Sequence, residues 1–326
     1  MNGRVLVTGA SGFVGRRLVS HFVNAGCAPV RAAYRTPPTA PTPGVEICSV
    51  GDLGGDTDWY AALDGVDTVV HCAARVHVMH DTAADPLDAY RRSNVEGSLQ
   101  LARSAVEAGC RRFVFISSIK VNGESTAPGC AFTEAHVPAP VDPYGVSKLE
   151  AEQGLFALGQ QGGLEVVVIR PPLVYGPGVS ANFLSLMRFV EWGVPLPLRG
   201  VDNRRSLVGL DNLVDLVSLC IRHPAAAGEV FLAADGEDVS TPALLTGIAR
   251  EMGRSPRLFL LPSGLMSRVA RGLGREALFA RVCGSLVLDT SKARSVLGWQ
   301  PPDSVDEGLR KTVAAYRVGR HEARRV

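Results

Sequence analysis

Short apolar runs alternate with amphipathic stretches along the first half of the chain, and this alternation predicts strands that alternate with helices. The runs of strand length lie at residues 5–8, 29–34, 45–50, 67–74, 112–118 and 166–170, with a further one at 229–234. Strands separated by helices favour a parallel sheet. We therefore expect an α/β protein with a Rossmann-type doubly wound sheet and a smaller C-terminal α/β domain.

The first strand runs into a turn with three glycines, Gly9, Gly12 and Gly15. There Gly9 permits a tight turn, Gly12 lets the backbone approach a phosphate, and Gly15 lets the next helix pack on the strand. The amphipathic pattern that follows ends at Gly26, a typical helix stop. Glycines alone also mark ordinary strand-to-helix turns. The strand before them and the helix after them favour a dinucleotide site at a helix N-terminus.

Composition limits the remaining possibilities. The chain has 326 residues, 46% of them hydrophobic and 20% charged, with a formal net charge of +2. This charge gives no field that favours nucleic acid. No apolar run reaches the ~18 residues that span a bilayer, and the first strand starts too early for a signal peptide. We expect a cytoplasmic protein with no integral membrane segment.

The seven cysteines show no paired or Cys-x-x-Cys spacing. We therefore interpret them as reduced, mostly buried small apolar residues, and we expect no metal site.

The end of the second strand bears on cofactor choice. NAD-selective folds place an acid there, whereas an arginine can hold a 2′-phosphate. This chain has Arg35 and no acid at that position, which favours NADP(H), with NAD(H) as the alternative. Asp52, after the third strand, could hydrogen-bond adenine. Small residues Ala73 and Ala74 would let a cofactor approach the fourth strand's end.

A long helix is expected between about residues 85 and 109, with Val95, Leu99, Ala102 and Val106 on a stripe that is core or a subunit seam. Asn94 lies within it. A mid-helix asparagine is costly, which suggests that its side chain bonds to backbone.

The fifth strand brings Ser117 and Ser118 to the carboxyl edge of the sheet, where doubly wound folds hold ligands. Further on, Asp142 can cap a helix, which places Tyr144 and Lys148 at i and i+4 on one face. A nearby ammonium stabilises a phenolate, whose free pKa is ~10, and would bring proton exchange towards neutral pH. Ser118 could then bond the reacting oxygen while Tyr144 moves its proton.

In this order, the glycine turn, Asn94, the serines and the Tyr-x-x-x-Lys pair resemble the extended short-chain dehydrogenase/reductase family. The resemblance implies a catalytic triad of Ser118, Tyr144 and Lys148. It also implies contacts to the cofactor from Gly9, Ser11, Gly12, Phe13, Val14, Gly15, Arg35, Asp52, Leu53, Ala73, Ala74, Asn94, Ser117, Tyr144, Lys148 and Pro171. Substrate contacts are expected from Ser118, Lys120, Tyr144, Asn182 and Arg204.

The family's organisation implies a dinucleotide-binding domain at residues 1–175, to which 205–235 return. Residues 176–204 and 236–326 would form the nucleotide-sugar domain, closed by the apolar anchor at 297–302. We also expect a homodimer.

Departures from the family's patterns narrow the reaction. Dehydratases carry an acid pair where this chain has Ile119 and Lys120, and many epimerases carry an asparagine where it has Leu173. The sequence most resembles bacterial NADPH-dependent reductases of the C4 ketone of a UDP-4-keto-6-deoxy-N-acetylhexosamine, which serve surface polysaccharide and O-antigen synthesis. The alternative enzyme is a UDP-sugar 4-epimerase. An NADP-sensing protein without catalysis is a third hypothesis, which the intact triad disfavours.

Overall fold

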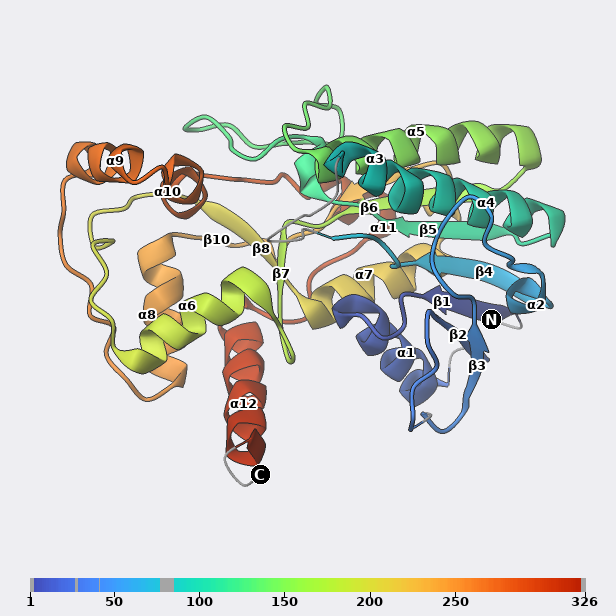
Figure 1. The fold of residues 1–326 in the computed structure, drawn as a ribbon, viewed down its shortest axis with the longest axis horizontal. Helices are drawn as coiled ribbons and strands as arrows, with labels where there is room; N and C mark the ends of the chain where they lie inside the picture. Colours follow the sequence, from blue (N-terminus) through green and yellow to red (C-terminus); the bar gives the residue numbers. More distant parts are fainter. Residues whose placement is uncertain (1–2, 27–28, 41, 77–84, 324–326) are drawn as a thin grey trace.

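A twisted parallel sheet forms the larger part of the structure (Figure 1), a computed structural model that describes residues 3–26, 29–40, 42–76 and 85–323. The strands run in the order β3-β2-β1-β4-β5-β6-β9, all parallel. Their bounds are β1 Arg4–Thr8, β2 Val30–Tyr34, β3 Val45–Ser49, β4 Val66–His71, β5 Arg112–Ile116, β6 Glu165–Arg170 and β9 Val230–Leu232. This order confirms the predicted doubly wound fold.

Helices cover both faces of this sheet. One face carries α1 (Phe13–Ala25), α7 (Leu210–Arg222) and α11 (Ser291–Leu297), and the other carries α2 (Tyr60–Leu63), α4 (Gly97–Glu107) and α5 (Pro143–Gly162). Each face has its own buried apolar cluster, because the central strands are apolar on both sides. The described residues include no helix long and apolar enough to cross a membrane.

The helix expected at 85–109 is built in three parts. It consists of α3 (Pro86–Tyr90), a π-helical segment η1 (Arg91–Glu96) and α4. The wider turns change which side chains face the sheet, and the fully buried face carries Leu101, Ala102 and Ala105. Of the predicted stripe, Leu99 and Val106 instead pack against glycines of α5. Local widening of this kind is frequent at functional sites.

A smaller unit is built from segments that come after β6 in the chain. It contains a second sheet, in the order β10-β8-β7, and a third apolar cluster. Its elements are β7 Leu173–Tyr175, α6 Ala181–Trp192, β8 Arg205–Gly209, β10 Asp238–Val239, α8 Thr241–Glu251, α9 Ser263–Gly272, α10 Glu276–Cys283 and α12 Val305–Ala323. Short 3-10 turns lie at η2 Ile119–Val121 and η3 Pro224–Ala226.

Two expected boundaries differ in the structure. Strand β8 pairs with β7 and not with the large sheet, so within 205–235 it is α7 and β9 that return to that sheet. The segment expected to close the smaller domain belongs to the larger core instead. There Trp299 is buried with Leu297, and its indole Nε1 donates to Asp215 of α7 at 2.9 Å.

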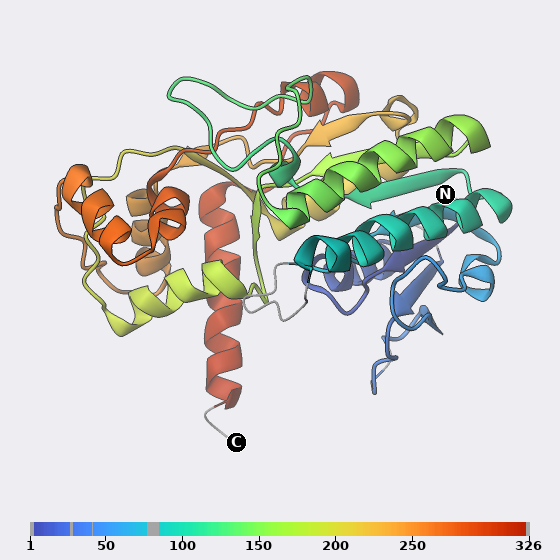
Figure 2. The ribbon, with the colours of Figure 1, turned by 45° about the horizontal axis from the view of Figure 1, so that its top comes forward.

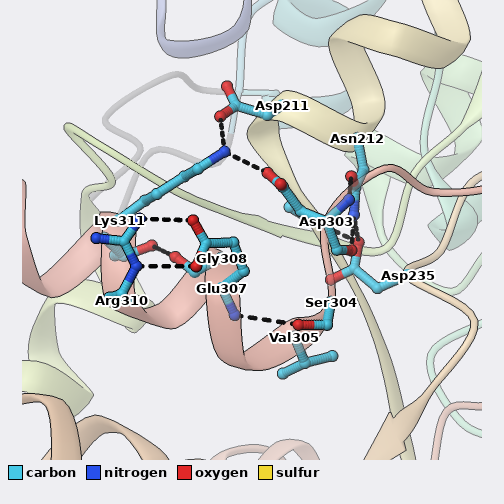
Figure 3. Close-up of polar contacts among 12 residues, drawn as sticks. Asp211, Asn212, Asp235, Asp303, Ser304, Val305, Glu307, Gly308, Arg310 and Lys311 are labelled. Carbon is cyan, nitrogen blue, oxygen red and sulfur yellow. Dashed lines mark hydrogen bonds and ion pairs between the residues drawn. The ribbon is translucent and has the colours of Figure 1, made fainter.

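A polar network joins α12 to the larger unit (Figure 3). Lys311 of α12 bonds both Asp211 and Asp303, and Asn212 donates to Asp235 at 2.7 Å. Asp235 also accepts the hydroxyl of buried Tyr175, at 2.8 Å. Charge pairing and a buried hydroxyl therefore fix the two units together next to the ends of β7 and β9.

Six cysteines lie in the described residues, and all are free, as predicted. Cys110 and Cys220 are buried, Cys48, Cys72 and Cys283 are half-buried, and Cys130 is exposed, so fewer are buried than expected. The seventh, Cys27, lies outside the described residues.

Candidate active site

The glycine turn between β1 and α1 has the tight geometry that the sequence predicts. Gly9 adopts φ +64°, and a Cβ there would lie 2.7 Å from the Ala73 amide nitrogen at the end of β4. A Cβ on Gly15 would lie 2.2 Å from the Gly9 carbonyl oxygen. Both positions therefore require glycine, because the backbone segments approach closely.

The N-terminus of α1 suits an anion. Gly12 is its N-cap, and in the described chain no side chain caps the helix and no acid lies in its first turn. Its first amides are therefore available for a phosphate, and the helix dipole favours one. Ser11 is exposed beside this end, while Phe13 and Val14 are half-buried in the first turn. The residues present thus fit a dinucleotide pyrophosphate.

A buried histidine forms hydrogen bonds with the residue that precedes the glycine turn and with α4. His71 of β4 shares a hydrogen bond of 2.6 Å with the Thr8 hydroxyl and another of 2.9 Å with Ser98 of α4. Burial, with a smaller effect of Lys148, lowers the pKa of His71 to about 3, so the ring stays neutral. The Thr8 oxygen also accepts from the Ala73 amide at 3.3 Å. Sequence reasoning missed this histidine.

Asn94 bonds to backbone as expected. Its Oδ1 accepts from the Arg75 amide at 2.8 Å, and its Nδ2 donates to the Arg75 carbonyl and to the Ser147 hydroxyl, each at 3.0 Å. Ser147 in turn donates to the Tyr144 carbonyl at 2.8 Å. Asn94 therefore connects the loop after β4 to the first turn of α5, which carries Tyr144.

Arg35 and Asp52 lie beside one another at the ends of β2 and β3. Their side chains form an ion pair of 3.7 Å and are 78% and 90% exposed. A carboxylate therefore stands near the guanidinium that the sequence assigned to a 2′-phosphate. Asp52 follows β3, the strand that pairs with β2, so no acid stands beside Arg35 in the sequence.

The predicted triad lies on adjacent elements. Ser118 follows β5, and its Oγ accepts from the Lys120 amide at 3.2 Å. Asp142 caps α5 by accepting from the Gly145 amide at 2.7 Å, which begins the helix just before Tyr144. Lys148 is buried one turn on, and its Nζ donates to the carbonyl of Ile116, at the end of β5, at 2.9 Å.

These contacts hold the tyrosine's helix against the serine's strand. The Lys148 nitrogen lies 5.9 Å from the Tyr144 ring centre and 4.3 Å from that of Phe115. Within the described residues, no hydrogen bond engages the Tyr144 hydroxyl, so it can bond a substrate.

The electrostatics of this pair differ from the sequence expectation. Burial raises the pKa of the Tyr144 phenol, and Asp142 and Tyr90 add to that effect. Burial lowers the pKa of Lys148 to about 8, although Cys72 and Glu152 oppose the shift. Lys148 is therefore the more acidic member of the pair. The expected acidification of Tyr144 by a nearby ammonium does not overcome the cost of burying a phenolate.

A buried ionic network behind the triad has no counterpart in the sequence analysis. Glu152 of α5 pairs with Arg170 of β6 through bonds of 2.5 to 3.2 Å and also accepts the Ser117 hydroxyl. Arg170 donates to Asn122 at 2.9 Å. Ser117 and Asn122 flank Ser118 in the chain, so the network holds the serine loop from both sides. The Ser117 hydroxyl, which the sequence analysis expected to contact the cofactor, donates to Glu152 in this network.

Lys120, Arg204 and Asn182, which were expected to contact the substrate, differ in their burial and in their partners. Lys120 forms ion pairs with Glu124 and Asp142, so its charge is already compensated. Arg204 is 71% exposed and pairs with Asp238 at 2.9 Å, and Asn182 is exposed in the first turn of α6.

The arginine next to Arg204 has a different environment. The Nη1 of Arg205 donates to the carbonyls of Arg281 and Gly284 at 2.9 and 3.0 Å. Burial lowers the pKa of Arg205, and in the described part of the chain it forms no ion pair. Arg205 therefore differs from Arg204 in being half-buried and in lacking an acidic partner among the described residues, which leaves its charge available to an anion. The expected substrate contact at Arg204 stays a prediction, and Arg205 is a second candidate that the sequence analysis did not name.

The other expected cofactor residues mainly shape the pocket. Ala73 and Ala74 are half-buried after β4, Leu53 packs against Gly97 of α4, and the Pro171 carbonyl accepts from the Ile119 amide at 2.9 Å. No group of three or more metal-ligating side chains occurs among the described residues.

A glycine-rich turn follows β1, and a Ser-Tyr-Lys set lies after β5 and on α5. Together they define a dinucleotide-dependent α/β enzyme. Residues 5–234 match the NAD dependent epimerase/dehydratase family. The chain is also 44% identical over 313 residues to a UDP-glucose 4-epimerase from Vibrio cholerae, covering 96% of this chain and 95% of the relative. The protein therefore belongs to the NAD dependent epimerase/dehydratase family.

Solved structures agree with this assignment. MoeE5, in complex with UDP-glucuronic acid and NAD, has a TM-score of 0.78 at 29% identity, covering 97% of this chain and 100% of that chain. The fold also matches a UDP-glucuronic acid 4-epimerase from Bacillus cereus in complex with NAD, with a TM-score of 0.78 at 21% identity, covering 97% and 99%.

Proposed function

We propose that this protein is a UDP-hexose 4-epimerase that uses NAD. The observation that carries the proposal is the intact Ser118, Tyr144 and Lys148 set beside a phosphate-binding turn, in a chain 44% identical to a UDP-glucose 4-epimerase. This replaces the C4-reductase as our main hypothesis, and the reductase becomes the alternative.

The glycine turn and the N-terminus of α1 would hold the pyrophosphate of NAD, which would supply a reversible hydride acceptor. Oxidation at C4 requires a base for the C4 hydroxyl proton, and the Tyr144 oxygen, in its phenolate form, would take that proton. Ser118 donates a hydrogen bond to the same oxygen and polarises the carbonyl as it forms. The result is a 4-keto sugar and a protonated tyrosine.

Epimerisation then needs the 4-keto sugar to present its other face. Tyr144 would return its proton to the C4 oxygen in the reverse reduction, so the proton taken in the first half-reaction is given back in the second and no net oxidation remains. Lys148, whose pKa burial lowers to about 8, supports both steps by titrating together with Tyr144, so the pair can give up the first proton near pH 8. The Glu152 and Arg170 pair keeps the serine loop fixed during this exchange.

The nucleotide diphosphate would bind on the side of the smaller unit. Arg205 offers a half-buried guanidinium for phosphate, and exposed Asn182 can bond the nucleotide. Anchoring at the diphosphate leaves the hexose free to rotate, as epimerisation requires.

The test is incubation of the purified protein with UDP-glucose, with and without NAD, followed by NMR of the sugar. We expect UDP-galactose to form with no net reduction of added cofactor. The Tyr144→Phe variant serves as the matched control. Failure of both UDP-glucose and UDP-N-acetylglucosamine to epimerise would reject the proposal.

One observation favours the reductase. Arg35 is exposed at the end of β2, where it could bind the 2′-phosphate of an exchangeable NADPH. A reductase would oxidise one NADPH for each UDP-4-keto-6-deoxy-N-acetylhexosamine, whereas an epimerase keeps its cofactor through both half-reactions. Cofactor stoichiometry therefore separates the two functions.

A further inference from the structure

An exposed apolar stripe runs along the helical hairpin at the end of the smaller unit. Leu265, Val269 and Leu273 are 47%, 50% and 70% exposed and stand four residues apart, so they share one face of α9 and its C-terminal end. Leu278 of α10 is also 52% exposed. Of the fourteen exposed large hydrophobic side chains in the described residues, six lie within 259–278. Such a concentration marks an interaction surface.

The same segment is strongly basic. Residues 254–284 contain six arginines against one glutamate, a net charge of +5 in a chain whose total is +2. All six are exposed: Arg254, Arg257, Arg268, Arg271, Arg275 and Arg281. Arg271 pairs with Glu276 at 2.8 Å, and the other five form no ion pair within the described chain. The charge there is therefore available to an anionic partner.

The hairpin lies away from the cofactor cradle. Both views show α9 and α10 side by side at the end of the long axis opposite β2 and β3 (Figures 1 and 2). A large surface docked against this end would leave the glycine turn in solvent.

We propose that the arginine–leucine patch, made of Leu265, Val269, Leu273, Leu278, Arg268, Arg271, Arg275 and Arg281, docks the enzyme onto an anionic lipid surface. Leucine and valine side chains enter the interface between headgroups and acyl chains, while arginine guanidinium groups pair with phosphates. A second copy of this chain is a poorer partner, because two such patches would place like charges opposite each other. The patch would attach to the lipid surface from outside and would not cross the bilayer.

The experiment is co-sedimentation of the full chain with phosphatidylglycerol-containing vesicles and with phosphatidylcholine vesicles. We expect binding to the former alone, reversed by salt. An arginine near such a surface contributes roughly fivefold in affinity, so Arg268→Gln with Arg275→Gln should weaken binding about twenty-five-fold. Leu265→Gln with Leu273→Gln should weaken it about tenfold or more.

Val137→Gln with Val318→Gln is the matched control, because these side chains are 85% and 58% exposed outside the patch. It should bind vesicles like the unaltered protein. All variants should keep their activity on soluble UDP-glucose, so the docking and the proposed reaction fail independently. Equal binding to both vesicles, or binding insensitive to the arginine and leucine changes, would overturn the proposal. A dimer that the leucine changes dissociate would assign the patch to a second copy instead.

Discussion

Replacement of Gly15 by alanine tests whether the glycine turn builds the cofactor cradle. The added Cβ would lie 2.2 Å from the Gly9 carbonyl oxygen and 2.8 Å from its carbon, where contacts of at least 3.4 Å are ordinary. Helix α1 must therefore move from the turn by about 1 Å, since both neighbours are backbone. Overpacking of this kind costs about 1–3 kcal/mol. At ~2–4 °C per kcal/mol for large domains, Tm should fall by roughly 2–12 °C.

The same movement displaces the amides that face the pyrophosphate. Loss of one good charge-assisted bond costs ~1.5–3 kcal/mol, so NAD affinity should fall by about tenfold or more. Thermal unfolding with and without NAD, and calorimetric titration, measure both effects. Gly319→Ala in α12 is the control, because no atom lies within 4 Å of its added Cβ. It should leave Tm unchanged or raise it. A Gly15→Ala protein as stable and as tightly bound to NAD as the original would refute the reasoning.

Three further predictions follow from the site. Tyr144→Phe should lower kcat by ~10²–10⁴ while NAD affinity is kept, because it removes only the proton carrier; a loss below tenfold in steady-state assays would move the proton to another group. The log of kcat/KM should rise with pH and level off near pH 8, where the Tyr144 and Lys148 pair loses its first proton. Lys148→Met should move that inflection to higher pH, and an unchanged inflection in the variant would contradict this assignment. Asp52→Asn should improve NADP affinity relative to NAD about two- to fivefold, as expected for an exposed pair with Arg35, and competitive titration would show the idea wrong if the ratio did not move.

Local signals were sufficient for the parts of the site that lie close together in the chain. The glycine turn could be predicted because the strand, Gly9 to Gly15 and the helix are consecutive, and the tight φ at Gly9 is a property of that segment. The capping by Asp142 and the backbone bonds of Asn94 followed from the cost of those residues elsewhere.

Long-range contacts were the parts that the sequence could not supply. Glu152 and Arg170 lie 18 residues apart on a helix and a strand, and neither position shows a pattern that names its partner. Asp52 reaches Arg35 only because β3 lies beside β2. The low pKa of Lys148 comes from burial, which is set by the whole fold.

The sequence also could not show which apolar core a given side chain joins, because that depends on contacts between distant segments. An apolar anchor such as Trp299 shows that a core lies nearby, but not which one, and the structure buries it in the core of the large sheet. The surroundings of Arg204 and Arg205, neighbours in the chain, also depend on tertiary contacts. Arg204 pairs with Asp238, while Arg205 donates to two backbone carbonyls.

The most direct test of the proposed epimerase is the fate of the C4 configuration in UDP-glucose. The purified protein, supplied with NAD, is mixed with UDP-glucose, and proton NMR follows the sugar while absorbance follows reduced cofactor. The account predicts that UDP-galactose appears at turnover far above one per enzyme, with no accumulation of reduced cofactor, and that Tyr144→Phe abolishes it. The contradicting result is an unchanged UDP-glucose spectrum, together with, in a parallel incubation with NADPH and a UDP-4-keto-6-deoxy-N-acetylhexosamine, oxidation of one NADPH for each keto sugar added.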